Sequence, residues 1–300
     1  MNNDDISFYQ QQHHSMPPMF PNPTPNEDDT PSLLAEPRKV GMAAGSRWLL
    51  HAWIIFKARW AMWLGMAFVM GLITSVLGEI PYVGWLSGLL NLLFVGGLML
   101  SCDALVEGDE LEFEYLFSGF KFKLKELLIC SVIMFGLVLL LLTVLILLIL
   151  MGSSMDSDTL FNMFNIPDSI NARDVLVLLI FFLLFMVLLL PVMMMTWFAP
   201  ALICLHDIKA WDAMKMSLQA CLRNVMPFLV YSLVMFAVMF GMGLLISGIV
   251  VGAIALTNEI IGMILALLFF IPLGLAWTII WIISYYTSYR SIWTKPMLEE

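Results

Sequence analysis

The sequence predicts an all-α membrane protein with six transmembrane helices. Hydrophobic residues make up 61% of the 300 residues and charged residues only 12%, against about 25% charged residues in an ordinary soluble domain. The apolar residues gather into six stretches long enough to cross a bilayer. All 14 lysines and arginines except Arg173 fall on one side of these stretches. We therefore expect a multi-pass chain with a fixed orientation.

Each expected span has about the 20 apolar residues that a helix needs to cross a hydrocarbon core of roughly 30 Å. Short turns at residues 78–81 and 257–258 join the first two and the last two spans, and residues 152–173 form a longer connection. The spans are expected to pack as a bundle. They cover residues 60–78, 82–106, 127–151, 174–203, 225–252 and 259–288.

The basic residues predict which side of the membrane each connection faces. Lysine and arginine near short membrane segments stay in the cytoplasm. Four separate basic clusters agree on one orientation: before the first span, between the second and third, between the fourth and fifth, and after the sixth. The protein is thus expected in a bacterial inner (cytoplasmic) membrane, with its N- and C-termini in the cytoplasm.

The chain divides into three expected parts. Residues 1–44 are polar and rich in proline, a composition typical of a disordered tail, and they lack the basic and apolar regions of a signal peptide. Residues 45–295 form the transmembrane domain, and residues 296–300 a short cytoplasmic tail. The four cysteines stand singly, which favours reduced thiols over disulfides or a metal cluster.

An amphipathic helix is expected before spans one, three and five. In each segment apolar residues recur at helical spacing, with basic residues on the flanks. Such helices lie in the membrane interface, with the apolar face in the acyl boundary and the bases toward anionic headgroups. The three apolar stripes are Leu49, Trp53, Phe56 and Trp60; Phe113, Leu116, Phe117, Phe120 and Leu124; and Trp211, Met214, Leu218 and Leu222.

Basic residues beside these stripes are the predicted contacts with lipid headgroups. One interpretation is a threefold repeat, each unit consisting of an interfacial helix and a transmembrane hairpin. The alternative is that any loop beside a membrane tends to be basic and amphipathic. The predicted contact residues are Arg47, Lys57, Arg59, Lys121, Lys123, Lys125, Lys209, Lys215 and Arg223.

Glycines and prolines within the spans predict local features of the bundle. Small residues four positions apart let two helix backbones approach closely, so we expect helix packing there, with homodimerisation as the alternative. Pro191 and Pro272 lie inside spans and should bend them; the alternative is broken helices that border a substrate site. The glycines predicted to pack helices are Gly84, Gly88, Gly248 and Gly252.

Several motifs resemble a known family. They are WFAPAL at residues 197–202, WDAMKMSLQACLRN at 211–224 and PFL at 227–229, together with PYVGW at 81–85 and LFSGF at 116–120. These motifs resemble those of uncharacterised bacterial six-span membrane proteins, which are similar to the membrane domain attached to some glycerophosphodiester phosphodiesterases. The resemblance covers about residues 38–295. It implies an architecture and an association with membrane lipid, and it supplies no catalytic residues.

Side chains that could carry out chemistry are scarce. Ionisable residues are missing from the interiors of all six expected spans, where pumps and intramembrane enzymes place them. Cys204, His206 and Asp207 could form a ligand trio or a nucleophile with its base. However, adjacent loop residues seldom converge on one metal or one reacting atom. We therefore expect no catalytic, cofactor-binding or metal site.

The function most consistent with these residues is that of a non-catalytic organiser, assembly factor or regulator in the membrane. Its expected partners are anionic membrane lipids and a further membrane protein. Nucleic acid is not expected, because no basic stripe or aromatic-basic module is present. The alternative is a transporter or flippase for an apolar or lipid-like solute. An intramembrane enzyme would need convergent polar groups that the sequence does not offer.

Overall fold

The computed structural model describes residues 32–82, 84–152, 172–256 and 258–295. Within them, six helices are long and apolar enough to cross a membrane, so the predicted fold class is confirmed. The expected tails at residues 1–31 and 296–300, and most of the connection 152–173, lie outside the described residues. The six helices are α3 (Trp60–Gly78), α4 (Leu86–Glu107), α6 (Leu124–Gly152), α8 (Ala172–Trp197), α11 (Val225–Leu256) and α12 (Glu259–Trp293).

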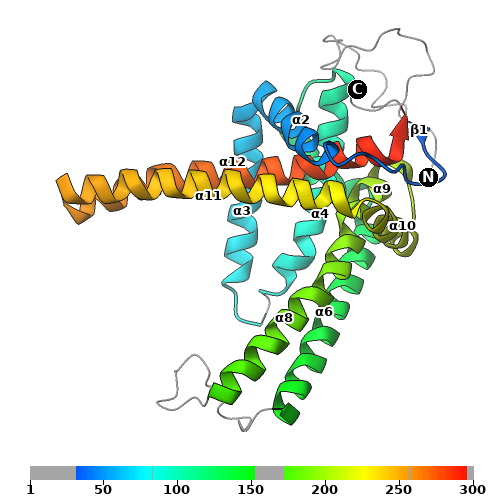
Figure 1. The fold of residues 1–300 in the computed structure, drawn as a ribbon. Coiled ribbons are helices and arrows are strands. Elements are labelled where there is room, and N and C mark those ends of the chain that lie inside the picture. Colours follow the sequence, from blue (N-terminus) through cyan, green and yellow to red (C-terminus); the bar gives the residue numbers. More distant parts are fainter. Residues whose placement is uncertain (1–31, 83, 153–171, 257, 296–300) are drawn as a thin grey trace.

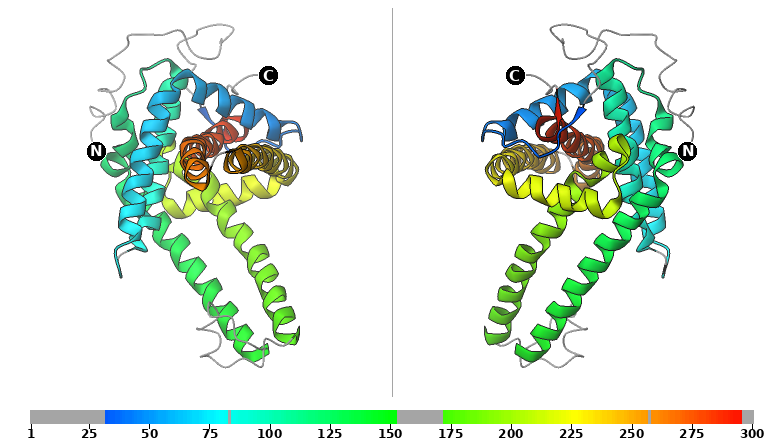
Figure 2. Two further views of the ribbon diagram at one scale, coloured as in Figure 1. Left: turned by 90° about the vertical axis from the view of Figure 1, so that its left-hand side faces the viewer. Right: turned by 90° about the vertical axis from the view of Figure 1, so that its right-hand side faces the viewer.

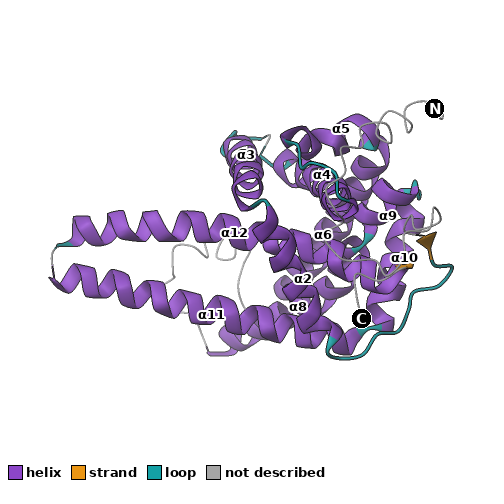
Figure 3. Cartoon of the chain, turned by 90° about the horizontal axis from the view of Figure 1, so that it is seen from above, coloured by secondary structure: helices purple, strands orange, loops and turns teal. Residues whose placement is uncertain are grey.

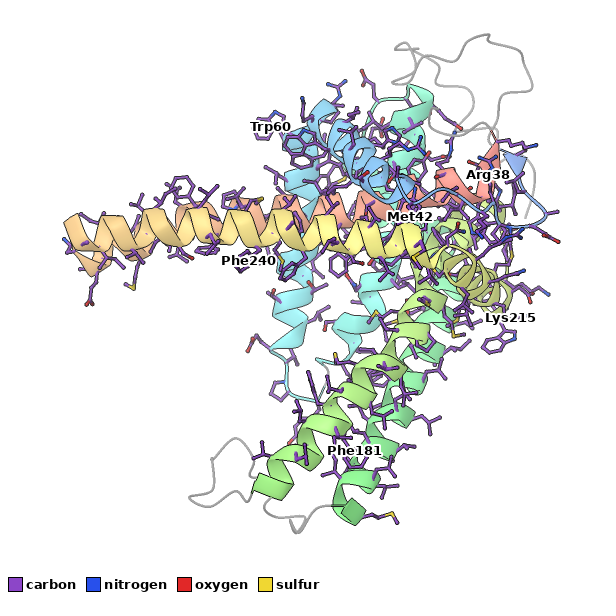
Figure 4. All side chains as sticks on the ribbon, viewed as in Figure 1. Arg38, Met42, Trp60, Phe181, Lys215 and Phe240 are labelled. Carbon is purple, nitrogen blue, oxygen red and sulfur yellow. The ribbon has the colours of Figure 1, made fainter. Side chains whose placement is uncertain are left out.

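These helices form three hairpins that diverge from a common base and do not pack as one parallel bundle. Figure 1 shows α3–α4 and α6–α8 leaving the base in one general direction, while α11–α12 runs across them. Figure 3 shows the same α11–α12 hairpin extending away from the other helices. Apolar side chains cover the projecting parts, as Phe240 on α11 illustrates (Figure 4). Helices that are apolar all round are typical of a lipid environment.

The base consists of short helices and the last turns of α12. Short helices precede α3, α6 and α11 as predicted: α2 (Ala44–Ala58); the 3-10 helix η1 (Phe113–Phe117) with α5 (Ser118–Phe122); and α10 (Ala210–Arg223). A further helix, α9 (Ala199–His206), follows α8. Figure 2 shows α2 meeting the upper end of α3 at an angle and lying over α12. The last four turns of α12 are almost wholly buried among these helices, so α12 is the central helix of the base.

Residues 32–43 are docked on the base, although the sequence analysis assigns them to a disordered tail. The strand β1 (Ser32–Leu33) pairs antiparallel with β2 (Thr294–Lys295). We call residues 32–40 the strap. Its proline, Pro37, is buried. Pairing with the end of α12 gives the strap backbone the hydrogen bonds that a free tail would make with water.

The close backbone approaches occur at glycines other than those predicted. A Cβ atom at Gly119 would lie 2.2 Å from the Leu93 oxygen, and one at Gly45 would lie 2.1 Å from the Pro227 oxygen. These contacts seat α5 on α4 and α2 on α11. A Cβ at Gly88, Gly248 or Gly252 would meet no atom within 4 Å, and Gly84 approaches only Gly78 within their own turn. The predicted glycines therefore make no helix contact inside the described chain.

Both membrane-helix prolines lie within continuous helices. Pro191 is inside α8, and Pro272 is inside α12. The sequence left open whether they bend a helix or break it. Because neither helix is interrupted there, neither proline creates the unwound backbone that would border a solute site in a broken-helix transporter.

Candidate functional site

Four of the nine predicted headgroup-contact residues form ion pairs within the chain. Lys121 pairs with Glu114, and the other pairs are Lys123–Asp207 at 2.5 Å, Lys215–Asp212 at 2.8 Å and Arg223–Glu36 at 3.1 Å. Such exposed pairs add little stability, but each carboxylate offsets the positive charge beside it. Lys215 also lowers the pKa of Asp212, first by a hydrogen bond and then by its charge. These four bases therefore attract an anionic surface only weakly.

The other predicted bases are exposed. Arg47, Lys57, Lys125 and Lys209 have no ion-pair partner among the residues that the structure describes. Arg59 is also exposed. Two of the bases outside ion pairs, Arg47 and Lys57, belong to α2, whereas Lys125 and Lys209 lie singly beside the second and third short helices. The first of the three short helices therefore carries more unpaired positive charge than either of the others.

One face of α2 is packed into the base. Trp48, Ala52 and Ile55 are almost completely buried. The Trp48 ring lies 5.1 Å from that of Phe228 on α11, between ring centroids. The indole N–H of Trp63 on α3 donates to the Ile55 carbonyl at 3.2 Å. This bond fixes the angle between α2 and α3, so α2 is held in one orientation.

The opposite face of α2 carries an exposed stripe, which we call the α2 stripe. Its five residues lie at i, i+3, i+6, i+7 and i+10, so they share one side of the helix. A base stands at each end and apolar side chains stand between them; Leu50 is 55% exposed and Trp53 45%. The α2 stripe is Arg47, Leu50, Trp53, Ile54 and Lys57.

The apolar stripe predicted for α2 is partly wrong. Trp53 and Trp60 face outward as expected, and Figure 4 shows Trp60 pointing away from the base. Phe56 is only 6% exposed and belongs to the packed face, while Leu49 is half-buried. The reason is that α2 has two apolar faces. Sequence periodicity alone could not tell which residues pack against protein.

The other two predicted stripes differ in how much they expose. In the second stripe, Leu116 is fully buried, and Phe117 and Phe120 pack around Phe94 of α4. The middle of that stripe therefore belongs to the protein core, while its two ends, Phe113 and Leu124, are exposed. In the third stripe Met214 is buried, whereas two other members, Trp211 and Leu222, are more than half exposed.

A buried ionic cluster lies at the centre of the base. The Arg290 guanidinium is 3.6 Å from the Asp103 carboxylate and donates to the Tyr286 hydroxyl at 2.8 Å. The Tyr286 hydroxyl in turn donates to Asp103 at 2.7 Å. The side chain of Arg290 is 6% exposed and that of Asp103 is 24% exposed. Sequence reasoning missed this cluster because its members are 183 positions apart, and no local pattern connects them.

Cys204, His206 and Asp207 point to different parts of the base. The imidazole of His206 is hydrogen-bonded to the Tyr289 hydroxyl, and Asp207 pairs with Lys123. Cys204 is buried against α4. The three side chains therefore do not converge on one reacting atom. Within the described ranges, no group of three or more His, Cys, Asp or Glu residues could hold a metal ion.

The motif residues in α8–α10 join helices to one another. The break between α8 and α9 leaves backbone groups that Ser217 satisfies: its hydroxyl accepts from the Phe198 N–H at 2.9 Å and donates to the Met194 carbonyl at 2.6 Å. The Trp197 indole N–H donates to the Ser288 hydroxyl at 3.1 Å. Nearby on α10, burial raises the pKa of the Cys221 thiol, so that thiol stays protonated. Contacts between helices therefore explain the residues of these motifs.

Asn224, the last residue of one motif, holds the strap. Its side-chain amide donates to the Arg38 carbonyl at 3.0 Å, and its oxygen accepts from the Val40 N–H at 2.9 Å. The Arg38 guanidinium reaches the carbonyl oxygens of Ser291 at 3.5 Å and Thr294 at 3.3 Å. A helix leaves its last carbonyls without partners and favours a positive charge there. The strap therefore caps the end of α12.

Comparison with known proteins supports a membrane protein but identifies no family. The chain is 35% identical over 100 residues to a protein of Burkholderia thailandensis that is described as a probable inner membrane protein. The match covers 33% of this chain and 34% of that relative. No protein-family model and no solved structure matches the chain. The six membrane-crossing helices and this relative together define a multi-pass integral membrane protein.

Proposed function

We propose that this protein is a non-catalytic organiser of other membrane components, and that its base lies on the cytoplasmic side of the inner membrane against anionic lipid. The observation that carries the proposal is the uncompensated positive charge on the exposed edge of the base. Arg47, Lys57 and Lys125 extend from it without carboxylate partners among the described residues. Lysine and arginine beside a membrane helix stay cytoplasmic and attract the anionic inner leaflet. Both termini would then be cytoplasmic.

The polar side chains of the base support a structural role over a catalytic one. Asp103, Tyr286 and Arg290 bond to one another, and Ser217 and Asn224 bond to backbone groups. The first three connect α12 with α4, Ser217 connects α10 with the end of α8, and Asn224 connects the end of α10 with the strap. The resemblance to the membrane domain attached to glycerophosphodiester phosphodiesterases supports an association with lipid, although it supplies no reaction.

Cross-linking in native membranes tests the organiser role. The full-length chain is cross-linked, purified, and analysed for bound proteins and lipids. The proposal expects a reproducible membrane-protein partner and enrichment of phosphatidylglycerol or cardiolipin over phosphatidylethanolamine. Retention of lipids in the proportions of the bulk membrane, with no recurrent partner, would refute it. An impermeant label that reaches residue 210 from the periplasm would refute the orientation.

A further inference from the structure

The three basic segments of the base differ in the charge that they present. In the second segment, Lys121 and Lys123 face Glu114 and Asp207, and in the third, Lys215 faces Asp212. By contrast, both bases of the α2 stripe, Arg47 and Lys57, have no carboxylate partner among the described residues, whereas the other two segments each keep one base outside an ion pair, Lys125 or Lys209. The three segments are therefore unequal in their electrostatics.

We infer that the α2 stripe is the principal site at which this protein recognises anionic phospholipid. This inference rests on the proposed function and names the part of the chain that performs the lipid contact. Leu50 and Ile54 would enter the acyl boundary, and Trp53 would lie at the level of the headgroups, where indole rings are enriched. Arg47 and Lys57 would each meet a phosphate.

The spacing of the two bases fits more than one lipid molecule. Ten residues separate Arg47 from Lys57, which corresponds to about 15 Å along a helix. Their side chains thus extend from opposite ends of the α2 stripe, with the apolar residues between them. The bases therefore contact separate headgroups, while the apolar centre enters the space between those lipids.

The position of α2 in the chain favours a bilayer as the occupant of this face. α2 ends at Ala58 and α3 begins at Trp60, so Arg59 alone separates the stripe-bearing helix from one able to cross the membrane. Figure 2 shows α2 running away from the upper end of α3 at an angle, and not continuing along the axis of α3. We therefore expect α2 to lie at the level of the membrane surface when α3 is inserted. The basic ends of the α2 stripe complement the negative charge of that surface.

The packing behind the α2 stripe makes α2 a preformed binding surface. Trp48 and Ile55 are buried on its inner side, and Gly45 allows its backbone to approach that of Pro227. The helix therefore does not have to fold when lipid binds. Amphipathic segments that fold on a membrane lose part of their binding energy in ordering, and α2 avoids that loss.

Lipid titration of charge-neutral variants tests the inference. The purified full-length chain in a neutral detergent is titrated with acyl-labelled phosphatidylglycerol and, separately, with phosphatidylcholine. The test variant is Arg47→Gln with Lys57→Gln. The matched control is Lys121→Gln with Lys215→Gln, which also removes two positive charges. Thermal unfolding of each variant shows whether its fold is kept.

The test variant should lose up to about 30-fold in apparent affinity for phosphatidylglycerol, as follows from roughly 1 kcal/mol per base near an anionic surface. The control should change less than threefold, and binding of phosphatidylcholine should not change. Replacing Trp53 by Ser should weaken the binding of both lipids. Equal losses in test and control variants would overturn the assignment to α2 and leave the proposed function intact. A wild-type chain with no preference for phosphatidylglycerol would overturn both.

Discussion

Replacing Asp103 by Asn should destabilise the base strongly, although the change alters only one side-chain atom. The substitution leaves the Arg290 charge buried without its counterion. At 3.6 Å and an effective dielectric constant of 20, two unit charges interact by about 4–5 kcal/mol. Asp103 is partly exposed, which lowers this figure. Measured losses for broken buried pairs are about 3–5 kcal/mol, so we expect a loss of about 3 kcal/mol.

A double-mutant cycle separates the ion pair from other effects of the substitution. Asp103→Asn, Arg290→Met and the double variant are unfolded in mixed micelles by increasing the fraction of sodium dodecyl sulfate. The double variant should be more stable than the sum of the two single losses predicts, by at least 1.5 kcal/mol. The same cycle on the exposed pair Lys121–Glu114 should give about 0.5 kcal/mol or less. Equal coupling energies for the two pairs would refute the reasoning.

Three further predictions concern the strap, the glycines and pH. Asn224→Ala should cost about 2 kcal/mol, because two strap backbone groups lose their partners, and should speed proteolysis within residues 32–43; unchanged cleavage would contradict it. Gly119→Ala should cost about 1–3 kcal/mol through a backbone clash, while Gly248→Ala should leave thermal unfolding unchanged. The lowered pKa of Asp212 means that its pair with Lys215 stabilises the fold at neutral pH and is lost as the pH falls below the ordinary 3.8. The difference in stability between wild type and Asp212→Asn should therefore vanish in acid, and a difference that grew there would contradict this.

The helices of the fold could be predicted from the sequence, but their packing against one another could not. Six long apolar helices and the short helix before each hairpin follow from composition and periodicity, which are local properties. The central position of α12 does not, since Tyr286 and Arg290 meet Asp103 only through tertiary structure. Trp48 and Trp53 look alike in the sequence, yet one is buried and the other exposed. Periodicity locates an apolar face but does not tell whether it contacts protein or lipid.

Headgroup contact by the nine predicted bases stays a prediction, and the pairing of four of them with carboxylates was not foreseen. Lys123 meets Asp207 across 84 positions, and Arg223 meets Glu36 across 187. A count of positive residues treats paired and unpaired lysines alike, so it cannot tell which segment presents the most uncompensated charge. The strap was missed for a related reason. Its composition is that of a free tail, and its partners lie at the far end of the domain.

The strap also sets an order of assembly. Ribosomes make residues 32–40 before the six helices described above, whereas the carbonyls that Arg38 caps belong to residues 291 and 294. The strap can therefore dock only after α12 has been made and inserted. A chain interrupted during synthesis would leave the strap undocked, where quality-control proteases could recognise it as a mark of incomplete biogenesis.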